Sequence, residues 1–213
     1  MLNATITMTD IKRPKMSCII PIHEMKNWQF FLTRCLESIY KQTFTDYEII
    51  ITNAGKMAEN TNRAIDASNG ELVKILYMDD YLASPDSLQE IVDNFKEEDN
   101  WLVTGCLHQE QGGIPTRPHY PFYSEDIKQG VNTIGSPSVV TIRNKRHLVF
   151  DENLSWLLDC ELYLRYYRLY GFPKILNTLN VIIGIGVHQM TNILTEEDKQ
   201  KEFNYLKKYD KNK

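Results

Sequence analysis

Two adjacent carboxylates, Asp79 and Asp80, are the residues of this chain whose placement most directly suggests chemistry. They come at the end of an apolar run within residues 70–82, and the Ser-Pro-Asp sequence that begins at Ser84 is expected to open a helix. In open α/β sheets, ligands bind in the crevice beyond the carboxyl ends of the strands. Carboxylate oxygens in that position suit hard divalent cations such as Mg²⁺ or Mn²⁺. The alternative is a polar turn that only ends a core strand, and these residues alone leave both readings open.

The first half of the chain alternates between strand-like and helix-like segments. The predicted strands are 16–22, 47–52 and 70–82, and the predicted helices are 28–40, 61–68 and a segment with Ser84 as N-cap and Pro85 at its first position. This order predicts an α/β fold with a parallel, Rossmann-like sheet and right-handed crossovers. The ends of the three strands are therefore expected to lie together at one edge of the sheet.

The second half is less regular. Strands are predicted at 101–107, 138–143 and 175–187, and helices at 156–170 and 195–209, the last with Thr195 as N-cap. Residues 109–130 are predicted to be a long loop, which in a compact domain is usually a lid, a binding loop or a disordered segment. Helices flanking a central sheet, followed by a C-terminal helix, are the predicted architecture.

Composition excludes several classes of protein. The chain has 213 residues, enough for one sizeable domain, and its net charge of −4 argues against a general nucleic-acid binder. The N-terminus lacks the apolar core of a secretory signal, and no apolar run reaches the length of a membrane span. The expectation is a cytoplasmic protein, with peripheral attachment at the inner membrane face and a homodimer left open. Four scattered cysteines are expected to be buried, reduced thiols: Cys18, Cys35, Cys106 and Cys160.

With these segments in order, the chain resembles a family 2 glycosyltransferase of the GT-A fold. The resemblance lies in the stretches SCIIPIHE, CLESIYKQTFTDYEIII, GELVKILYMDDYLASPDSL, FDENLSWLLDCELYLRYYRLYG and VHQMTN. It implies one domain over 1–213, divided into a loose leader (1–15), a nucleotide-sugar-binding half (16–107), an acceptor and catalytic half (108–192) and a C-terminal helix (195–213). It also implies an inverting transfer of a hexose from a UDP-sugar, UDP-glucose or a related hexose, to a glycan hydroxyl.

The resemblance further implies roles for individual residues. Asp79, with Asp80 beside it and His188 late in the chain, falls on the positions that hold Mn²⁺ or Mg²⁺ on the donor diphosphate. Asp159 falls on the position of the catalytic base. The sequence departs from the family motif where Tyr77 replaces a leading aspartate. The residues expected to bind the nucleotide are Pro21, Ile22, His23, Glu24, Asn53, Met78 and Asp79.

Asp159 has a competitor for the role of base in Glu161, two positions later. At roughly 100° per residue, two such side chains lie on nearly opposite faces of a helix, so only one can face the site. Asp159 is nearer the predicted helix N-terminus, where the helix dipole favours an ionised carboxylate. Glu161 is expected to pair with Arg165, four residues on. The remaining alternative for Asp159 is a simple helix-capping role.

Two functions from different classes remain after this comparison. The first is a metal-dependent, inverting glycosyltransferase in which Asp159 removes a proton from the acceptor hydroxyl. The second is a non-catalytic nucleotide- or sugar-binding module derived from such an enzyme, which the altered residues at Tyr77, Asn53 and Ala54 motivate. A nucleotidyltransferase is disfavoured. Enzymes of that class have a glycine-rich, basic loop after the first strand, and the corresponding segment of this chain has no glycine.

Overall fold

The computed structural model describes residues 12–146 and 149–211. Its first half contains β1 (Met16–Pro21), α1 (Trp28–Tyr40), β2 (Tyr47–Thr52), α2 (Met57–Ala67), β3 (Leu72–Ile75), β4 (Tyr81–Leu82) and α3 (Ser87–Asn94). The second half contains β5 (Trp101–Glu110), β6 (Thr116–His119), the 3₁₀ helices η1 (Glu125–Gln129) and η2 (Pro137–Val139), β7 (Val140–Arg143), α4 (Leu158–Tyr170), β8 (Lys174–Ile185), α5 (Met190–Ile193) and α6 (Glu196–Lys211).

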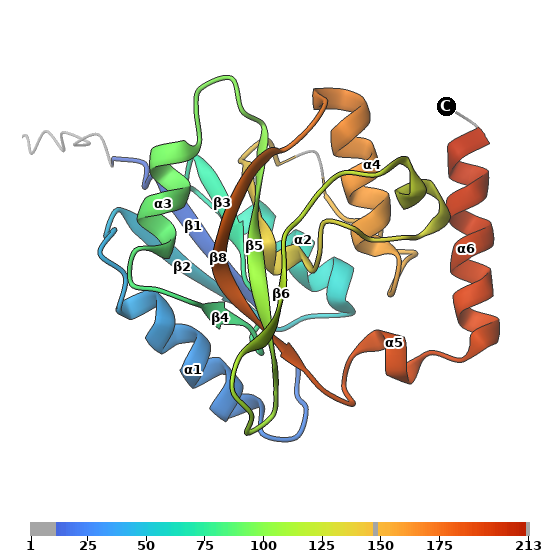
Figure 1. Cartoon of the computed structure of the whole chain (residues 1–213), viewed down its shortest axis with the longest axis horizontal. Coiled ribbons are helices and arrows are strands. Elements are labelled where there is room, and N and C mark those ends of the chain that lie inside the picture. The colour runs from blue at the N-terminus through green and yellow to red at the C-terminus, as the bar shows by residue number, and fades with distance from the viewer. Residues whose placement is uncertain (1–11, 147–148, 212–213) are drawn as a thin grey trace, which may run out of the picture.

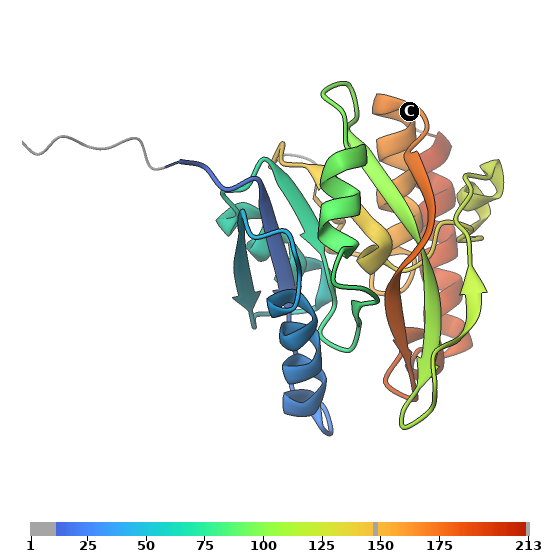
Figure 2. The ribbon, with the colours of Figure 1, turned by 60° about the vertical axis from the view of Figure 1, so that its left-hand side comes forward.

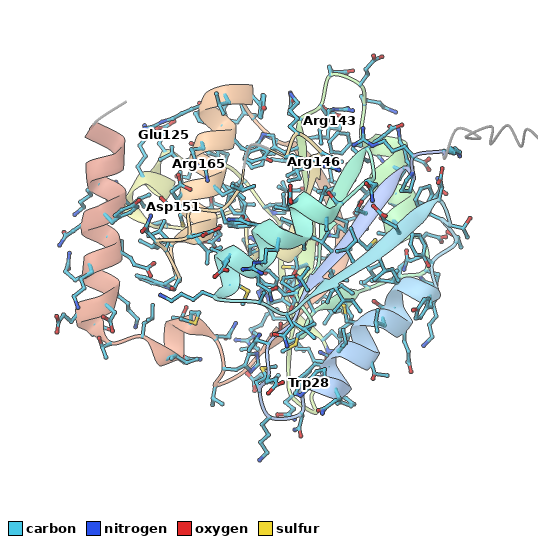
Figure 3. All side chains as sticks on the ribbon, turned by 180° about the vertical axis from the view of Figure 1, so that it is seen from behind. Trp28, Glu125, Arg143, Arg146, Asp151 and Arg165 are labelled. Atoms are coloured by element: carbon cyan, nitrogen blue, oxygen red, sulfur yellow. The ribbon has the colours of Figure 1, made fainter. Side chains whose placement is uncertain are left out.

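The strands form one mixed sheet in the order β2-β1-β3-β7-β5-β8-β4, with β6 paired to β5. The predicted parallel unit is present, because β1 pairs parallel with both β2 and β3. Strand β5 also pairs parallel with β8, whereas β7, β4 and β6 run antiparallel to their neighbours. The helices α1 and α3 lie on one face of this sheet, and α2 and α4 lie on the other (Figures 1 and 3). The predicted α/β architecture is confirmed.

The strands β2, β1 and β3 lie at one end of the sheet, and β5 and β8 lie toward the other, where β4 is the last strand. Figure 2 shows β5, β6 and β8 on the side where α4 and α6 lie, away from β1, β2 and α1. Among the described residues, no helix has both the length and the apolar character needed to span a bilayer. Residues 1–11 of the expected leader lie outside the described part, while Arg13 donates hydrogen bonds to the carbonyls of Asn69 and Gly70.

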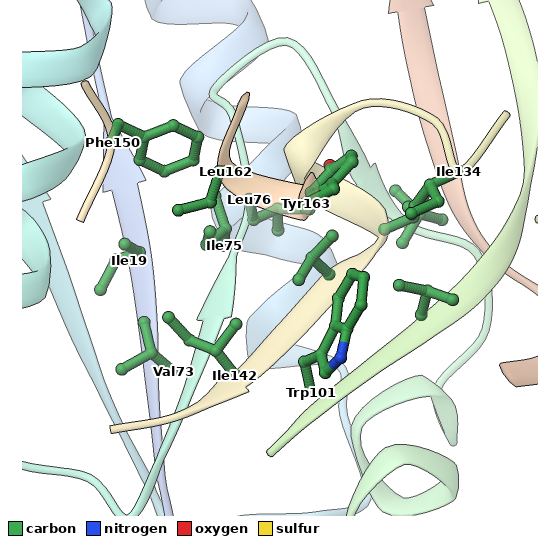
Figure 4. Close-up of a cluster of buried hydrophobic side chains, with 14 of the residues drawn as sticks. Ile19, Val73, Ile75, Leu76, Trp101, Ile134, Ile142, Phe150, Leu162 and Tyr163 are labelled. Carbon is green, nitrogen blue, oxygen red and sulfur yellow. The ribbon is translucent and has the colours of Figure 1, made fainter. Parts of the chain in front are cut away.

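The core joins both halves of the chain. It is formed by side chains from the central strands and from α4, and Figure 4 shows Ile19, Ile75, Ile142 and Tyr163 among them. The indole of Trp101 is 1% exposed and donates a hydrogen bond to the carbonyl of Gly171, at 3.1 Å. All four cysteines are buried and unpaired, as expected.

Several predicted boundaries are wrong, and the most informative error concerns residues 70–82. The regular strand β3 ends at Ile75, and Tyr81–Leu82 forms the separate strand β4, which pairs antiparallel with β8. The carboxylates therefore lie in a turn between two strands instead of at the end of one. The apolar run in the sequence does not predict this change of direction, because its periodicity does not distinguish a buried strand from a buried turn that follows it.

The other differences are local. Helix α3 begins at Ser87 instead of Pro85, because the Ser84 hydroxyl accepts a hydrogen bond from the Asp86 amide in a tight turn. Helix α2 begins at Met57, earlier than predicted. The predicted loop 109–130 contains strand β6 and the helix η1.

A matched pair of isoleucines tests the core. Ile75 in β3 is 0% exposed and Ile51 in the edge strand β2 is 44% exposed. We expect Ile75→Ala to lower the free energy of unfolding by about 2–5 kcal/mol, because it leaves a cavity in a close-packed region. Ile51→Ala is the control and is expected to cost about 1 kcal/mol or less. Urea denaturation followed by circular dichroism measures both, and equal losses would contradict the assigned core.

Candidate active site

A cavity of about 660 Å³ opens where the loops after β1, β2 and β3 meet the start of α4 and the end of β8. The predicted site residues that line it are Pro21, His23, Asp79, Asp80, Asp159 and His188. These residues are far apart in the chain, so the convergence comes from the fold. The central expectation that the carboxylate pair and Asp159 share one opening agrees with this geometry.

The remaining predicted residues do not line the cavity. Met78 is 1% exposed and belongs to the hydrophobic core, between two residues that do face the cavity. Ile22 packs partly against the core, and Glu24 and Asn53 are exposed outside the cavity. Met78 lies within the turn after β3, which directs its side chain into the core while Tyr77 and Asp79 on either side of it face the cavity.

Asp79 and His188 form a polar contact in the wall of the cavity. The Nε2 atom of His188 lies 2.8 Å from Oδ2 of Asp79, and the two side chains are 23% and 15% exposed. The hydrogen bond to Asp79 raises the pKa of His188 above its usual value, while partial burial opposes the shift. A carboxylate oxygen and an imidazole nitrogen therefore lie side by side, open to the cavity.

Asp80 does not join this pair. Its Oδ1 accepts a hydrogen bond from the Gly184 amide at 2.8 Å, and the residue is 2% exposed. Burial, followed by repulsion from Asp79, raises the pKa of Asp80 well above its usual value. The predicted trio of Asp79, Asp80 and His188 is thus not assembled as one set of ligands. Within the described part of the chain, no three His, Cys, Asp or Glu side chains group in a way that could hold a metal ion.

The turn that carries Asp79 is held by two residues that sequence reasoning did not identify. Arg34 of α1 donates a hydrogen bond from Nη2 to the Asp79 carbonyl at 2.6 Å, and its guanidinium lies over the ring of Tyr81. On the other side, a Cβ on Gly184 would lie 2.5 Å from the same carbonyl oxygen. An arginine on a helix and a glycine in a strand are common in protein sequences. Neither residue therefore predicts from the sequence that it contacts the Asp79 turn.

Asp159 lies in the first turn of α4, as predicted, and is held by two donors. Its Oδ1 accepts a hydrogen bond from the Cys160 amide at 2.7 Å, and its Oδ2 accepts one from Asn132 Nδ2 at 2.6 Å. Burial raises the pKa of Asp159 to about 6, although both hydrogen bonds favour the charged form. A carboxyl with such a pKa is suited to proton transfer near neutral pH.

Glu161 points away from the cavity, as the helical spacing predicts. It is 0% exposed and pairs with Arg165 through both of its oxygens, one of them 2.6 Å from Arg165 Nη2. Arg165 also bonds to the Val149 carbonyl, and Figure 3 labels it on α4 beside the loop that contains Asp151. The expected pairing of Glu161 with Arg165 is confirmed, which leaves Asp159 as the carboxylate of α4 that faces the cavity.

Two asparagines that line the cavity were not predicted as site residues. Asn60 donates to the Ile22 carbonyl at 2.8 Å and accepts from the Ala54 amide at 3.1 Å, so it joins the loops after β1 and β2. Asn132 holds Asp159, and its Oδ1 also accepts from the amides of Ile134 and Gly135. Asn60 was missed because the predicted helix started after it. Asn132 lies in an irregular segment without a recognisable motif.

Tyr77 stands where the related motif has an aspartate. It lines the cavity, but its hydroxyl oxygen is buried away from solvent. The position therefore contributes an aromatic surface to the cavity instead of a third carboxylate.

The Asp79–His188 contact can be tested by titration. We expect Asp79→Asn to lower the pKa of His188, because the hydrogen bond to the carboxylate is the main cause of its raised value. NMR titration of the imidazole measures the change. Asp86→Asn, an exposed position at the start of α3, is the control and should leave His188 unaffected. An unchanged His188 titration in Asp79→Asn would show that the two side chains do not interact in solution.

Comparisons with known proteins bear on the fold. No family model matches the chain, and no curated protein sequence matches it. Solved structures do match. S. aureus TarS in complex with UDP-GlcNAc has a TM-score of 0.65 and 15% identity, covering 90% of this chain and 66% of that one.

Two further enzymes match with lower scores. The mannosyltransferase PcManGT from Pyrobaculum calidifontis, in complex with GDP-Man and Mn²⁺, has a TM-score of 0.56 and 12% identity, covering 84% of this chain and 59% of that one. Glucosyl-3-phosphoglycerate synthase from Mycobacterium tuberculosis, in complex with Mn²⁺, UDP and glucosyl-3-phosphoglycerate, has a TM-score of 0.54 and 11% identity. The match covers 90% of this chain and 76% of that one.

The chain spans less than two thirds of the length of the TarS and mannosyltransferase structures. At these identities the likeness concerns the fold and leaves the activity of this chain open. The chain therefore has the GT-A fold that these sugar-nucleotide transferases share.

Proposed function

We propose that this protein is a glycosyltransferase that moves a hexose from a UDP-sugar to an acceptor hydroxyl, with inversion at the anomeric carbon. The observation that carries the proposal is that Asp79 with His188, and Asp159, open into one cavity although they come from distant parts of the chain. A diphosphate-binding pair and a carboxyl suited to proton removal are the two groups that such a transfer needs.

The donor is proposed to lie against the half of the chain formed by residues 16–107. Its nucleotide would contact the cavity walls contributed by Pro21, His23 and the loop at Lys56, which Asn60 ties together. Burial lowers the pKa of His23, so this ring is neutral at neutral pH and can stack or hydrogen-bond without adding charge. The UDP and UDP-GlcNAc in the TarS structures support a uridine nucleotide. A UDP-linked hexose, UDP-glucose or a related sugar, remains the proposed donor.

A divalent cation, Mn²⁺ or Mg²⁺, fits the residues present. Asp79 and His188 offer one oxygen and one nitrogen, and such cations are commonly held by one or two protein groups together with substrate phosphates. Mn²⁺ accompanies two of the related structures. When bound, the cation would stabilise the negative charge that grows on the departing diphosphate. Asp80 is proposed to keep the turn in place instead of binding the cation.

The acceptor is proposed to enter from the half formed by residues 108–192. Asp159 would accept the proton of its hydroxyl while Asn132 holds the carboxylate in orientation. A single displacement by that hydroxyl inverts the anomeric carbon and requires one base. The wall beside Asp159 includes Trp156, which offers an aromatic surface to a sugar ring.

The proposed activity is tested by UDP release. We expect release from at least one UDP-hexose to require Mn²⁺ or Mg²⁺, and Asp159→Asn to reduce turnover by about 10²–10⁴-fold, the usual contribution of a general base. The exposed Asp66→Asn of α2 is the control and should retain parental activity. Full activity in Asp159→Asn would remove that residue from the mechanism.

The same experiment separates the second function. A non-catalytic nucleotide-binding module is favoured by Tyr77 at the aspartate position and by a site with two, not three, candidate metal ligands. UDP binding measured by calorimetry, without UDP release from any donor or acceptor tried, would favour that module over the transferase.

The pH dependence follows from the pKa of Asp159. The base acts when ionised, so kcat/KM is expected to fall as the pH drops through about 6. Asn132→Ala removes a donor that favours the charged carboxylate, so the pKa of Asp159 rises and the acidic limb of the profile moves to higher pH. Asn177→Ala, an exposed position in β8, is the control. An acidic limb at the same pH in Asn132→Ala would contradict the role of that hydrogen bond.

A further inference from the structure

The start of α4 is held by a carboxylate from a distant helix. Glu202 of α6 accepts hydrogen bonds from three successive backbone amides, those of Ser155 at 2.8 Å, Trp156 at 2.9 Å and Leu157 at 2.8 Å. Its Oε1 takes the first and its Oε2 takes the other two. One side chain thus satisfies the amides of the whole segment that leads into α4.

The three amides that Glu202 binds lie directly before Leu158, the first helical residue of α4. The N-cap residue of α4, Leu157, has no side-chain hydrogen bond of its own, because leucine has no acceptor to offer. The positive end of the helix dipole, at the start of α4, attracts a negative charge. Glu202 supplies both an acceptor and a charge from 45 residues away.

The held segment belongs to the cavity. Ser155, Trp156 and Leu157 all line it, and Asp159 follows in the first turn of α4. A shift of this segment would move both the acceptor-side wall and the carboxylate. Such small displacements of reacting groups are costly, since a misplacement of about 1 Å can lower a rate by about 100-fold.

Helix α6 is itself fixed against the same region. The ring of Phe203 packs edge-to-face on Trp156, with ring centroids 5.3 Å apart, and Leu206 is 1% exposed. The Tyr205 hydroxyl lies 2.8 Å from Oδ2 of Asp151, in the loop before α4. These side chains, which follow Glu202 in α6, therefore hold it in register with the amides. Figure 1 shows α6 at the far side of the molecule from α1, with the segment that contains η1 between α6 and α4.

We propose that Glu202 is a positioning residue of the site, which holds residues 155–157 and through them sets the place of Asp159 for transfer. The proposal rests on the proposed glycosyltransferase function. It makes α6 part of the support of the site, although none of its described side chains lines the cavity.

The test compares the parent with Glu202→Gln, Glu202→Ala and Glu197→Gln. Glutamine keeps one acceptor oxygen and alanine keeps none, whereas Glu197 lies on the same helix, is 80% exposed at its side chain and pairs with Lys201. Hydrogen exchange, well below the unfolding temperature, reports whether the amides of residues 155–157 become exposed. UDP-release kinetics with a UDP-hexose and Mn²⁺ report kcat and the donor KM.

We expect faster exchange at residues 155–157 and a graded loss of kcat, about 10-fold or more for Glu202→Ala, with the donor KM unchanged because donor contacts lie elsewhere. Glu197→Gln should match the parent in both measurements. A purely structural cap would lower the unfolding temperature and speed exchange while kcat stayed at the parental value, and that result would overturn the proposal.

Failure of the proposal and failure of the proposed function give different results. An active parent whose Glu202 variants keep full kcat, or keep slow exchange at residues 155–157, removes Glu202 from the site but leaves the transferase intact. A parent that releases no UDP from any donor overturns the transferase, and the positioning role with it, whatever the exchange shows.

Discussion

The buried carboxylate of Asp80 is the constraint on which the geometry of the site depends. It accepts a hydrogen bond from the Gly184 amide of β8, and the Ser138 side chain of η2 favours its charged form. Beneath it, the fully buried Lys74 donates a hydrogen bond to the Ser138 carbonyl. Burial raises the pKa of Asp80 and lowers that of Lys74 to about 8, so both groups are driven toward their neutral forms. Buried polar groups of this kind are tolerated because they are hydrogen-bonded.

This network explains how adjacent aspartates come to have different surroundings. Asp80 ties the β3–β4 turn to β8, and the close approach of Gly184 to the Asp79 backbone leaves no room for a side chain there. With the turn fixed, Asp79 is directed into the cavity, where His188 from beyond the end of β8 meets it. The two carboxylates at the start of α4 differ in the same way. Glu161 is buried in an ion pair with Arg165, and Asp159 faces the cavity.

The cavity is thus a product of links between distant segments. Asn60 ties two loops on the donor side, Arg34 braces the turn from α1, and Asn132 and Glu202 converge on the start of α4. Each is a polar side chain whose partner is mainly a backbone group or a carboxylate. Such bonds specify position more than they add stability, because the exchange with water leaves a modest net free energy of about 1 kcal/mol for each neutral bond. The rigidity of the site comes from their number and direction.

The sequence by itself determined the α/β class, the order of the main elements and the carboxylates that face the cavity. Periodicity and turn chemistry act over a few residues, so α1, β2 and α6 could be placed from local patterns, as could the opposite directions of Asp159 and Glu161. The motif around Asp79 and the position of His188 are likewise readable in the chain.

Only the tertiary structure decided how these residues are held. The break between β3 and β4, the removal of Asp80 from the exposed pair and the core position of Met78 all depend on which neighbours surround an apolar stretch. Asn60, Asn132, Arg34 and Glu202 are ordinary polar residues that each bond to a partner 27 to 47 residues away. No local pattern encodes such bonds, because they form only after the sheet has brought their segments together.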